Sequence, residues 1–158
     1  MGLKCSNPTE FIPKAEADAR RRSIAQLMRV VIGISDPEIL DEQKLQVLDT
    51  LLWKYTEADG KHNTPFRSTG VLENPDAEVQ PEHVFTRSHL KHLLLTSRPE
   101  DVDRILQDAV GCLVTVEEHD KLSVHDGKAI GWQRYDLAEV NWTDLRTEVA
   151  HTKDLPLP

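Results

Sequence analysis

The stretch GCLVTVEEHDKL, residues 111–122, predicts a strand that turns directly into a helix. Its first five residues form a short, mostly apolar segment that includes the β-branched Val114 and Thr115, which is typical of a buried strand. Glu118 follows Thr115 at the three-residue spacing of a capping box, which begins a helix. We therefore expect a strand to Thr115 and a helix whose first turn carries His119.

Two amphipathic helices are predicted in the N-terminal third of the chain. Apolar side chains recur at helical intervals over residues 14–32, which indicates one buried face. A second helix is expected from the cap-like sequence Ser35-Asp36-Pro37-Glu38 to about Ala58. Two helices joined by a short turn bury their apolar stripes against each other, so we expect a helical hairpin over residues 14–59.

The region between the hairpin and the strand is predicted to be a loop followed by two short helices. Residues 61–81 contain three prolines and one glycine, which favours a long ordered loop with at most a short strand near Phe66. One helix is expected over residues 86–96. A second capping box, Ser97 with Glu100, predicts another helix to about Ala109.

These elements predict a mainly α fold with a small β element (α+β). We expect a single domain over residues 1–158 with one core, in which the helical hairpin packs on a small ββα-like unit. Residues 82–145 form the α+β part, with a short helix within 131–140 and a strand near residue 141. The closing DLPLP predicts a loose tail over 152–158.

Composition indicates an ordinary globular protein. The 158 residues are 39% hydrophobic and 29% charged, and no apolar run of about eighteen residues occurs. We therefore expect a cytoplasmic protein that does not span a membrane, although Met1-Gly2 with Ser6 matches the short N-myristoylation pattern. Cys5 and Cys112 lie far apart, which predicts two free thiols.

The net charge of −8 is spread unevenly along the chain. Residues 1–34 carry six lysines and arginines against three acids, a balance of +3 that leaves −11 on the remainder. Arg20-Arg21-Arg22 is the one cationic cluster. Because counterion release needs clustered cations, this charge disfavours nucleic acid as a partner except through a local contact.

Two of the seven histidines directly follow an acid, in Glu82-His83 and Glu118-His119. An acid beside an imidazole supplies either a metal ligand with a general base or a base with the group that orients it. Both pairs fall at predicted element boundaries, where side chains can converge without disrupting a core. A surface polar pair is the competing interpretation, because such dipeptides are common.

The order of these features resembles the ββα-metal arrangement of the HNH or His-Me finger nucleases over about residues 80–122. The resemblance implies a metal-dependent phosphodiesterase, an endonuclease acting on nucleic acid with Mg, Mn or Zn as the divalent metal ion. By position it implies Glu82 and His119 as metal ligands and His83 as the general base. The family normally has an asparagine between the two motifs, and none occurs between His83 and His119.

Cationic residues near the first acid-His pair are further candidates for binding an anionic substrate. Arg87 lies four residues after His83 and is placed to meet a phosphate, with pairing to a carboxylate as the alternative. Lys61, His62 and Arg67 in the predicted loop form a second tier of candidate substrate-binding residues.

Two other interpretations remain open at the level of sequence. His83, His89 and His92 form an alternative zinc set. A non-enzymatic helical protein that mediates protein-protein interaction or regulation needs only the amphipathic helices and suits the acidic charge. A dimer built on the first two helices is compatible with either function. Residues 132–135 contain aromatic side chains and an arginine, for which packing is favoured over stacking on a base.

Overall fold

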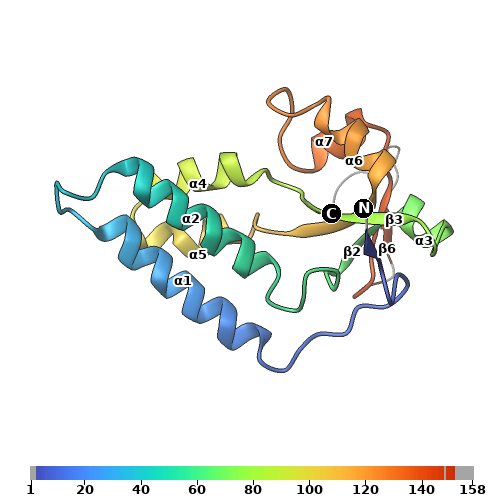
Figure 1. Cartoon of the computed structure of the whole chain (residues 1–158), viewed down its shortest axis with the longest axis horizontal. Coiled ribbons are helices and arrows are strands. Elements are labelled where there is room, and N and C mark those ends of the chain that lie inside the picture. The colour runs from blue at the N-terminus through green and yellow to red at the C-terminus, as the bar shows by residue number, and fades with distance from the viewer. Residues whose placement is uncertain (1–2, 148, 152–158) are drawn as a thin grey trace.

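The computed structural model describes residues 3–147 and 149–151, so the predicted tail over 152–158 and the Met1-Gly2 pair lie outside the described residues. The fold is mainly α with a small β part, as the sequence predicts (Figure 1). The helices are α1 (Ala17–Gly33), α2 (Asp41–Thr56), α3 (Thr69–Glu73), α4 (Arg87–Leu95), the 3-10 helix η1 (Pro99–Asp101), α5 (Val102–Leu106), α6 (Val116–Ser123) and α7 (Trp132–Leu137). The strands are β1 (Leu3–Lys4), β2 (Phe66–Ser68), β3 (Glu78–His83), β4 (Gly111–Thr115), β5 (Trp142–Asp144) and β6 (Val149–His151).

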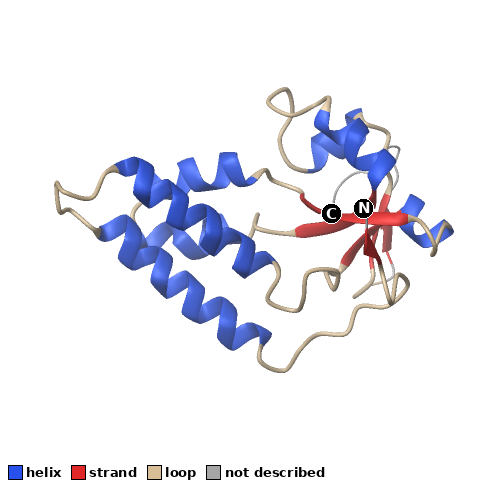
Figure 2. Ribbon diagram, viewed as in Figure 1, coloured by secondary structure: helices blue, strands red, loops and turns tan. Residues whose placement is uncertain are grey.

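The strands form one sheet in the order β1-β3-β4-β2-β5-β6. β2 and β4 are parallel, and the other neighbouring pairs are antiparallel. All six strands gather at one end of the molecule, and α1, α2, α4 and α5 form the other end (Figure 2). The chain is thus divided into a helical half and a sheet half.

A ββα unit lies in the sheet half. β3 and β4 pair antiparallel from Val79 opposite Thr115 to His83 opposite Gly111. α6 begins immediately after β4, and Thr115 and Glu118 form the capping box that the sequence predicts. The helix packs on both strands of the pair. The strand-to-helix transition at residue 115 is therefore confirmed.

The helical half is built around the α1–α2 hairpin, which packs on α4, η1 and α5. Its core includes Met28 of α1, Leu48 and Leu52 of α2, and Leu90 and Leu94 of α4, all fully buried. The hairpin agrees with the prediction, but α2 begins at Asp41 and not near Ser35. The Asp36 carboxylate accepts a hydrogen bond from the backbone N–H of Glu38, which makes a local turn in place of a helix cap.

The expected single core is wrong, because buried apolar residues form separate clusters in the two halves. The main cluster of the sheet half includes Cys112 and Val114 of β4, Leu122 of α6 and Tyr135 of α7. Phe85, in the short link between β3 and α4, packs against both this cluster and the helical core. The link after His83 therefore joins the two halves.

The long loop predicted over residues 61–81 is also corrected. The segment contains β2, α3 and the first residues of β3. β2 is entirely buried, and its partners β4 and β5 come from later in the chain. A three-residue strand stabilised by distant partners leaves little local pattern, which is why proline and glycine content alone indicated a loop.

Candidate functional site

A groove of about 600 Å³ runs along β3 between the two halves of the molecule. We call it the β3 groove. Its lining comes from α2 and α4 on the helical side, from residues 79–83 of β3, and from His119, Asp126 and Arg134 on the side of α6 and α7. The groove therefore collects most of the residues singled out in the sequence.

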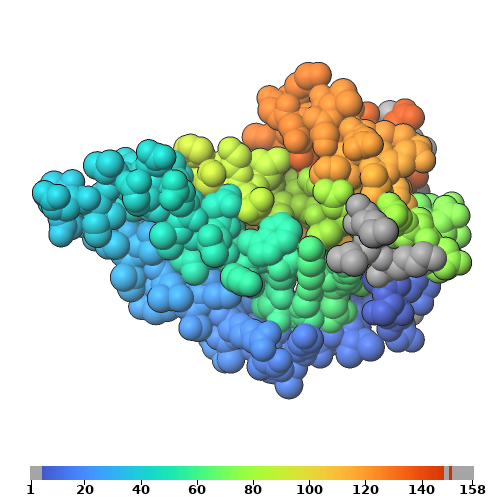
Figure 3. All heavy atoms as spheres, viewed as in Figure 1, coloured from blue at the N-terminus to red at the C-terminus, as the bar shows by residue number. Residues whose placement is uncertain are grey.

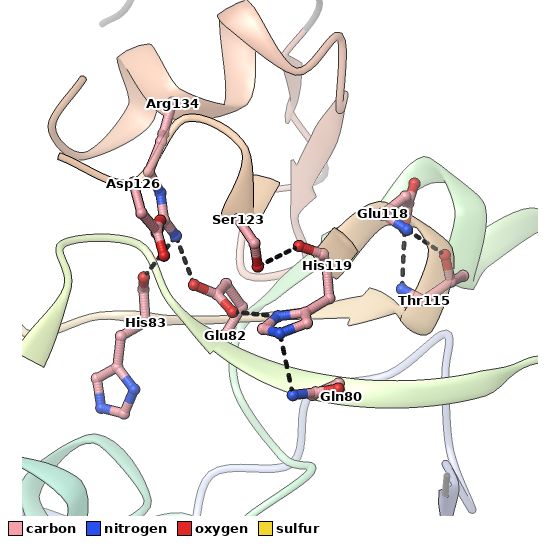
Figure 4. A network of polar contacts seen from close by, with 9 residues as sticks. All are labelled: Gln80, Glu82, His83, Thr115, Glu118, His119, Ser123, Asp126 and Arg134. Atoms are coloured by element: carbon pink, nitrogen blue, oxygen red, sulfur yellow. Dashed lines mark hydrogen bonds and ion pairs between the residues drawn. The ribbon is translucent and has the colours of Figure 1, made fainter. Parts of the chain in front are cut away.

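Glu82 and His119 meet at the sheet side of the β3 groove. Oε2 of Glu82 lies 2.7 Å from Nδ1 of His119, although the two residues are 37 positions apart (Figure 4). Nε2 of the same imidazole lies 3.3 Å from the side-chain nitrogen of Gln80. These partners correspond to an imidazole that donates from Nδ1 to the carboxylate and accepts at Nε2 from the amide. β3 and the first turn of α6 thus bring one acid and one imidazole together.

Arg134 holds the other oxygen of Glu82. Its Nη2 donates to Oε1 of Glu82 at 2.5 Å and to the backbone oxygen of His83 at 3.1 Å, and Nη1 donates to Asp126. The guanidinium is only 1% exposed. Burial alone would lower the pKa of Arg134, but the hydrogen bond and the charge of Glu82 raise it overall. Arg134 is therefore a permanent positive charge that fixes the Glu82 carboxylate.

His83 lies on the opposite side of β3 from its neighbour Glu82. Side chains alternate along a strand, and the His83 ring accordingly points away from Glu82 and His119 (Figure 4). It packs against Trp53 with ring centroids 5.3 Å apart and is buried. Burial, and after it the positive charge of Arg87, lowers the pKa of His83 to about 4. The structure thus brings Glu82 and His119 together but leaves His83 outside that contact, as a neutral imidazole in the same groove.

The helical wall of the β3 groove carries the predicted cations. Arg87, the first residue of α4, pairs with Asp49 of α2 at 2.5 Å, and its guanidinium lies 5.0 Å from the centre of the Trp53 ring. Lys91, one turn later, lies 3.6 Å from the same carboxylate. Lys61 also lines the groove, as does His62, whose pKa is lowered by burial and then by the charge of Lys61.

Arg67 does not belong to the groove, which corrects its assignment as a substrate-binding residue. The side chain is fully buried under the sheet half. It donates to the backbone oxygens of Thr64, Phe66, His62 and Glu10. Both terminal nitrogens of the guanidinium donate to main-chain carbonyls, so the buried side chain ties the N-terminal segment to β2 and is not exposed to a ligand.

Glu118, the acid of the second acid-His pair, has a structural role. Its carboxylate accepts hydrogen bonds from the backbone N–H of Thr115 at 2.9 Å, from the backbone N–H of Gly70 at 3.1 Å, and from the hydroxyl of Ser68. The first acid therefore faces the groove, whereas the second holds α6 to β2 and α3.

The three-histidine zinc set is wrong. His83 lies in β3, and Nδ1 of His92 contacts the backbone oxygen of Ser88 on α4 at 2.7 Å. No group of three or more His, Cys, Asp and Glu side chains that could hold a metal ion occurs within residues 3–147 and 149–151. Glu82 and His119 are thus a pair, and any cation between them would need ligands from outside the protein.

Sequence reasoning missed Arg134 and Gln80 as parts of the site. An arginine between the aromatic residues of WQRYDL needs a carboxylate partner if it is buried, and that is the one available signal. Its partner, Glu82, is 52 residues earlier in the chain, and no local pattern connects them. Gln80 could have been found from strand alternation, because it lies two residues before Glu82 on the same face.

Comparison with protein-family models, with curated proteins and with solved structures gives no match for this chain. Among the residues that the structure describes, no helix is long and apolar enough to cross a membrane.

Proposed function

We propose that the β3 groove binds a phosphodiester of nucleic acid and hydrolyses it with a divalent cation held by Glu82 and His119. The observation that carries the proposal is the 2.7 Å contact between the Glu82 carboxylate and the His119 imidazole. The contact lies where β3, β4 and α6 meet. In the HNH or His-Me finger nucleases, which this arrangement resembles, such a ββα unit would hold the metal ion. The contact is also inside a groove large enough for part of a polynucleotide backbone.

The chemistry of the two side chains fits a divalent cation. A carboxylate oxygen and an imidazole nitrogen are ligands that Zn²⁺ and Mn²⁺ accept, and a carboxylate suits Mg²⁺. A divalent cation held by both side chains would take the place of the proton between Nδ1 of His119 and Oε2 of Glu82, so their hydrogen bond would open on binding. Both side chains keep some exposure to the groove, 12% for Glu82 and 28% for His119. Two protein ligands leave the remaining positions to water and to phosphate oxygens. A cation there would stabilise the negative charge that develops on the phosphate and on the leaving oxygen.

The cations on the helical wall support a phosphate ligand. The groove is lined by four lysines and arginines (Lys61, Arg87, Lys91 and Arg134) and three acids (Asp49, Glu82 and Asp126), a balance of +1 on a chain whose net charge is −8. Asp49 balances Arg87 and Lys91 in the free protein. A phosphate that enters the groove would compete with Asp49 for the same donors, because guanidinium and ammonium groups bind phosphate as readily as carboxylate.

His83 is our candidate for the general base of this reaction. A lowered pKa of about 4 keeps its imidazole neutral at pH 7, which is the form that accepts a proton. Because its ring packs on Trp53, a rotation toward the phosphate is part of the proposal.

A second candidate function is hydrolysis without a metal, with His119 as the base. The observation that favours it is that both oxygens of Glu82 already have cationic or imidazole partners, Arg134 and His119. With Nδ1 of His119 fixed by the Glu82 carboxylate, Nε2 is the acceptor nitrogen, and a water that replaces the Gln80 amide there would give its proton to Nε2. The two candidates differ in their need for a cation.

The test is cleavage of labelled single- and double-stranded DNA and RNA in the presence of Mg²⁺, Mn²⁺ or Zn²⁺, and again with EDTA. We expect metal-dependent cleavage that falls at least about a hundredfold in Glu82→Gln and His119→Ala. His92→Ala, which alters an exposed histidine outside the groove, is the matched control and retains activity. Cleavage that persists in EDTA selects the second candidate. Absence of cleavage by the folded wild-type protein under every condition rejects both.

A further inference from the structure

The outer face of the α1–α2 hairpin is unusually apolar. Five of the ten large hydrophobic residues that are exposed in the described chain fall within residues 27–47, with exposures between 40% and 59%. They are Leu27, Val30, Ile39, Leu40 and Val47. We call this set the hairpin face. Scattered apolar residues on a surface need no explanation, but a concentration on two helices and the turn that joins them is typical of an interaction site.

The helical spacing places these residues away from the protein's own core. Leu27 and Val30 are three apart on α1, and the buried Ala25 and Met28 occupy the other side of that helix. On α2, Val47 is exposed next to the buried Leu48. α1 therefore turns one stripe toward the core and exposes Leu27 and Val30, and α2 adds the exposed Val47 beside its own buried stripe. Figure 3 shows α1 and α2 side by side as one continuous face of the molecule.

Charge is polarised along the same hairpin. The turn and the start of α2, residues 35–42, carry Asp36, Glu38, Asp41 and Glu42 without any lysine or arginine. This turn lies at the end of the molecule farthest from the sheet (Figure 1). The opposite end of the hairpin, residues 14–22 and 53–61, carries six lysines and arginines (Lys14, Arg20, Arg21, Arg22, Lys54 and Lys61) against four acids (Glu16, Asp18, Glu57 and Asp59), a balance of +2. Of these, Arg20 has only an exposed partner, Glu16 at 3.2 Å, which is a weak pairing.

We infer that the hairpin face binds a second copy of this chain, with the two hairpins antiparallel about a two-fold axis. The observation that selects this partner is charge complementarity. An antiparallel pairing lays the acidic turn of each copy against the basic end of the other, and a two-fold axis repeats the contact. A parallel pairing would set acid against acid. The proposal goes beyond the proposed function and does not depend on it.

The size of the face sets the expected strength of the dimer. Seventeen residues of α1 span about 25 Å, and two adjacent helices are about 20 Å wide, so each copy contributes about 500 Å². The total of about 1,000 Å² is at the lower limit for a specific interface. The dimer is therefore weak and reversible, and its population depends on protein concentration.

The experiment is analytical ultracentrifugation of the full chain over a wide range of concentration. The expected mass rises from 17.9 kDa toward twice that value as concentration increases. Leu27→Glu and Val47→Glu each weaken dimerisation at least about tenfold, because a carboxylate would be buried in the apolar contact. Leu137→Glu, at a residue of similar exposure outside the hairpin, is the matched control and leaves the dimer unchanged. Circular dichroism verifies that each variant is folded.

Charge reversal tests the antiparallel arrangement. Changing Glu38 and Glu42 to Lys weakens the dimer, and adding Arg20→Glu and Arg22→Glu restores it, because each reversed group then meets a reversed partner. A protein that stays monomeric at every concentration overturns the proposal. A dimer that tolerates both Leu27→Glu and Val47→Glu overturns the assignment of the face, and failure of the second charge reversal to restore the dimer overturns its orientation.

Discussion

Gly70 lies directly against the carboxylate of Glu118: a Cβ at residue 70 would be 2.5 Å from Oε1. The same carboxylate accepts the Gly70 N–H and closes the cap of α6. One acid thus joins α3, the end of β2 and the strand-to-helix turn that presents His119, and the close approach requires a residue without a side chain.

We expect Gly70→Ala to lower the free energy of unfolding by about 1–3 kcal/mol, because the added methyl must displace a hydrogen-bonded carboxylate. Urea denaturation measures the change. Gly33→Ala is the matched control: nothing lies within 4 Å of a Cβ at that position, and alanine favours the helix, so stability stays equal or rises slightly. Equal effects of the two substitutions would contradict this account of Gly70.

Thr115→Ala should cost about 1 kcal/mol of stability, because its hydroxyl accepts the Glu118 N–H at the start of α6. Thr50→Ala provides the comparison. Thr50 is exposed in the middle of α2, where its hydroxyl bonds back to the Gln46 carbonyl, and alanine there should be neutral or slightly stabilising. Thermal or urea unfolding of the two variants compares the stability lost at a helix cap with that lost at a threonine in the middle of a helix. An unchanged stability of Thr115→Ala would show that the cap contributes little.

Arg134→Met should destabilise the fold by about 3–5 kcal/mol, because it removes the buried partner of Glu82. Combining it with Glu82→Gln should cost less than the sum of the single changes, since the uncompensated carboxylate is then gone. The double-mutant cycle in urea measures this coupling.

Arg98→Met is the control, at an arginine whose side chain is 73% exposed in its ion pair, and it should change stability by less than about 1 kcal/mol. Additive effects at residues 82 and 134 would contradict the interaction.

The buried His83 predicts that stability falls in mild acid. In the unfolded chain its pKa is near 6.5, whereas burial lowers it to about 4 in the folded protein. The unfolded state therefore binds a proton first, so the contribution of neutral His83 is present above about pH 6.5 and is lost as the pH falls toward 4. Between pH 7 and pH 5 this amounts to about 2 kcal/mol.

Urea denaturation at pH 7, 6 and 5 tests this dependence. His83→Phe keeps a ring beside Trp53 and should remove most of this loss of unfolding free energy between pH 7 and pH 5. His92→Phe alters an exposed histidine and should leave the slope unchanged. A His83→Phe protein with the same slope as the wild type would assign the acid sensitivity to other groups.

Two identical sequence patterns show where prediction succeeded and where it failed. Thr115 with Glu118 forms the expected capping box, and Ser97 with Glu100 does not. Glu118 is held in place by groups of β2 and α3, so tertiary contacts support the local motif. The Ser97 hydroxyl instead donates back to the Leu94 carbonyl at the end of α4. Without tertiary contacts to support the capping box, the serine hydroxyl bonds to a nearby backbone carbonyl instead.

The candidate site was predictable in its local parts only. The boundary positions of Glu82 and His119 indicated that the two side chains could converge, and they do. That His83 faces the other way follows from strand alternation, but the sequence alone does not show what lies there. Trp53 and Asp49 belong to α2, and their approach to β3 and α4 is set by the packing of the two halves. Contacts between distant elements of this kind leave no periodic pattern.

Among the described residues, the short β1 strand pairs only with Glu78 and Val79, so the rest of β3 has no described strand beside it on that side. The backbone N–H of Val84 bonds to Val110, on the β4 side, so the alternation of the ladder directs the nitrogen of residue 81 toward the open edge. Residue 81 is a proline and has no hydrogen to donate. An added strand would therefore lack one of the backbone donors it needs at this edge, which disfavours edge-to-edge pairing and leaves recognition along the groove mainly to side chains.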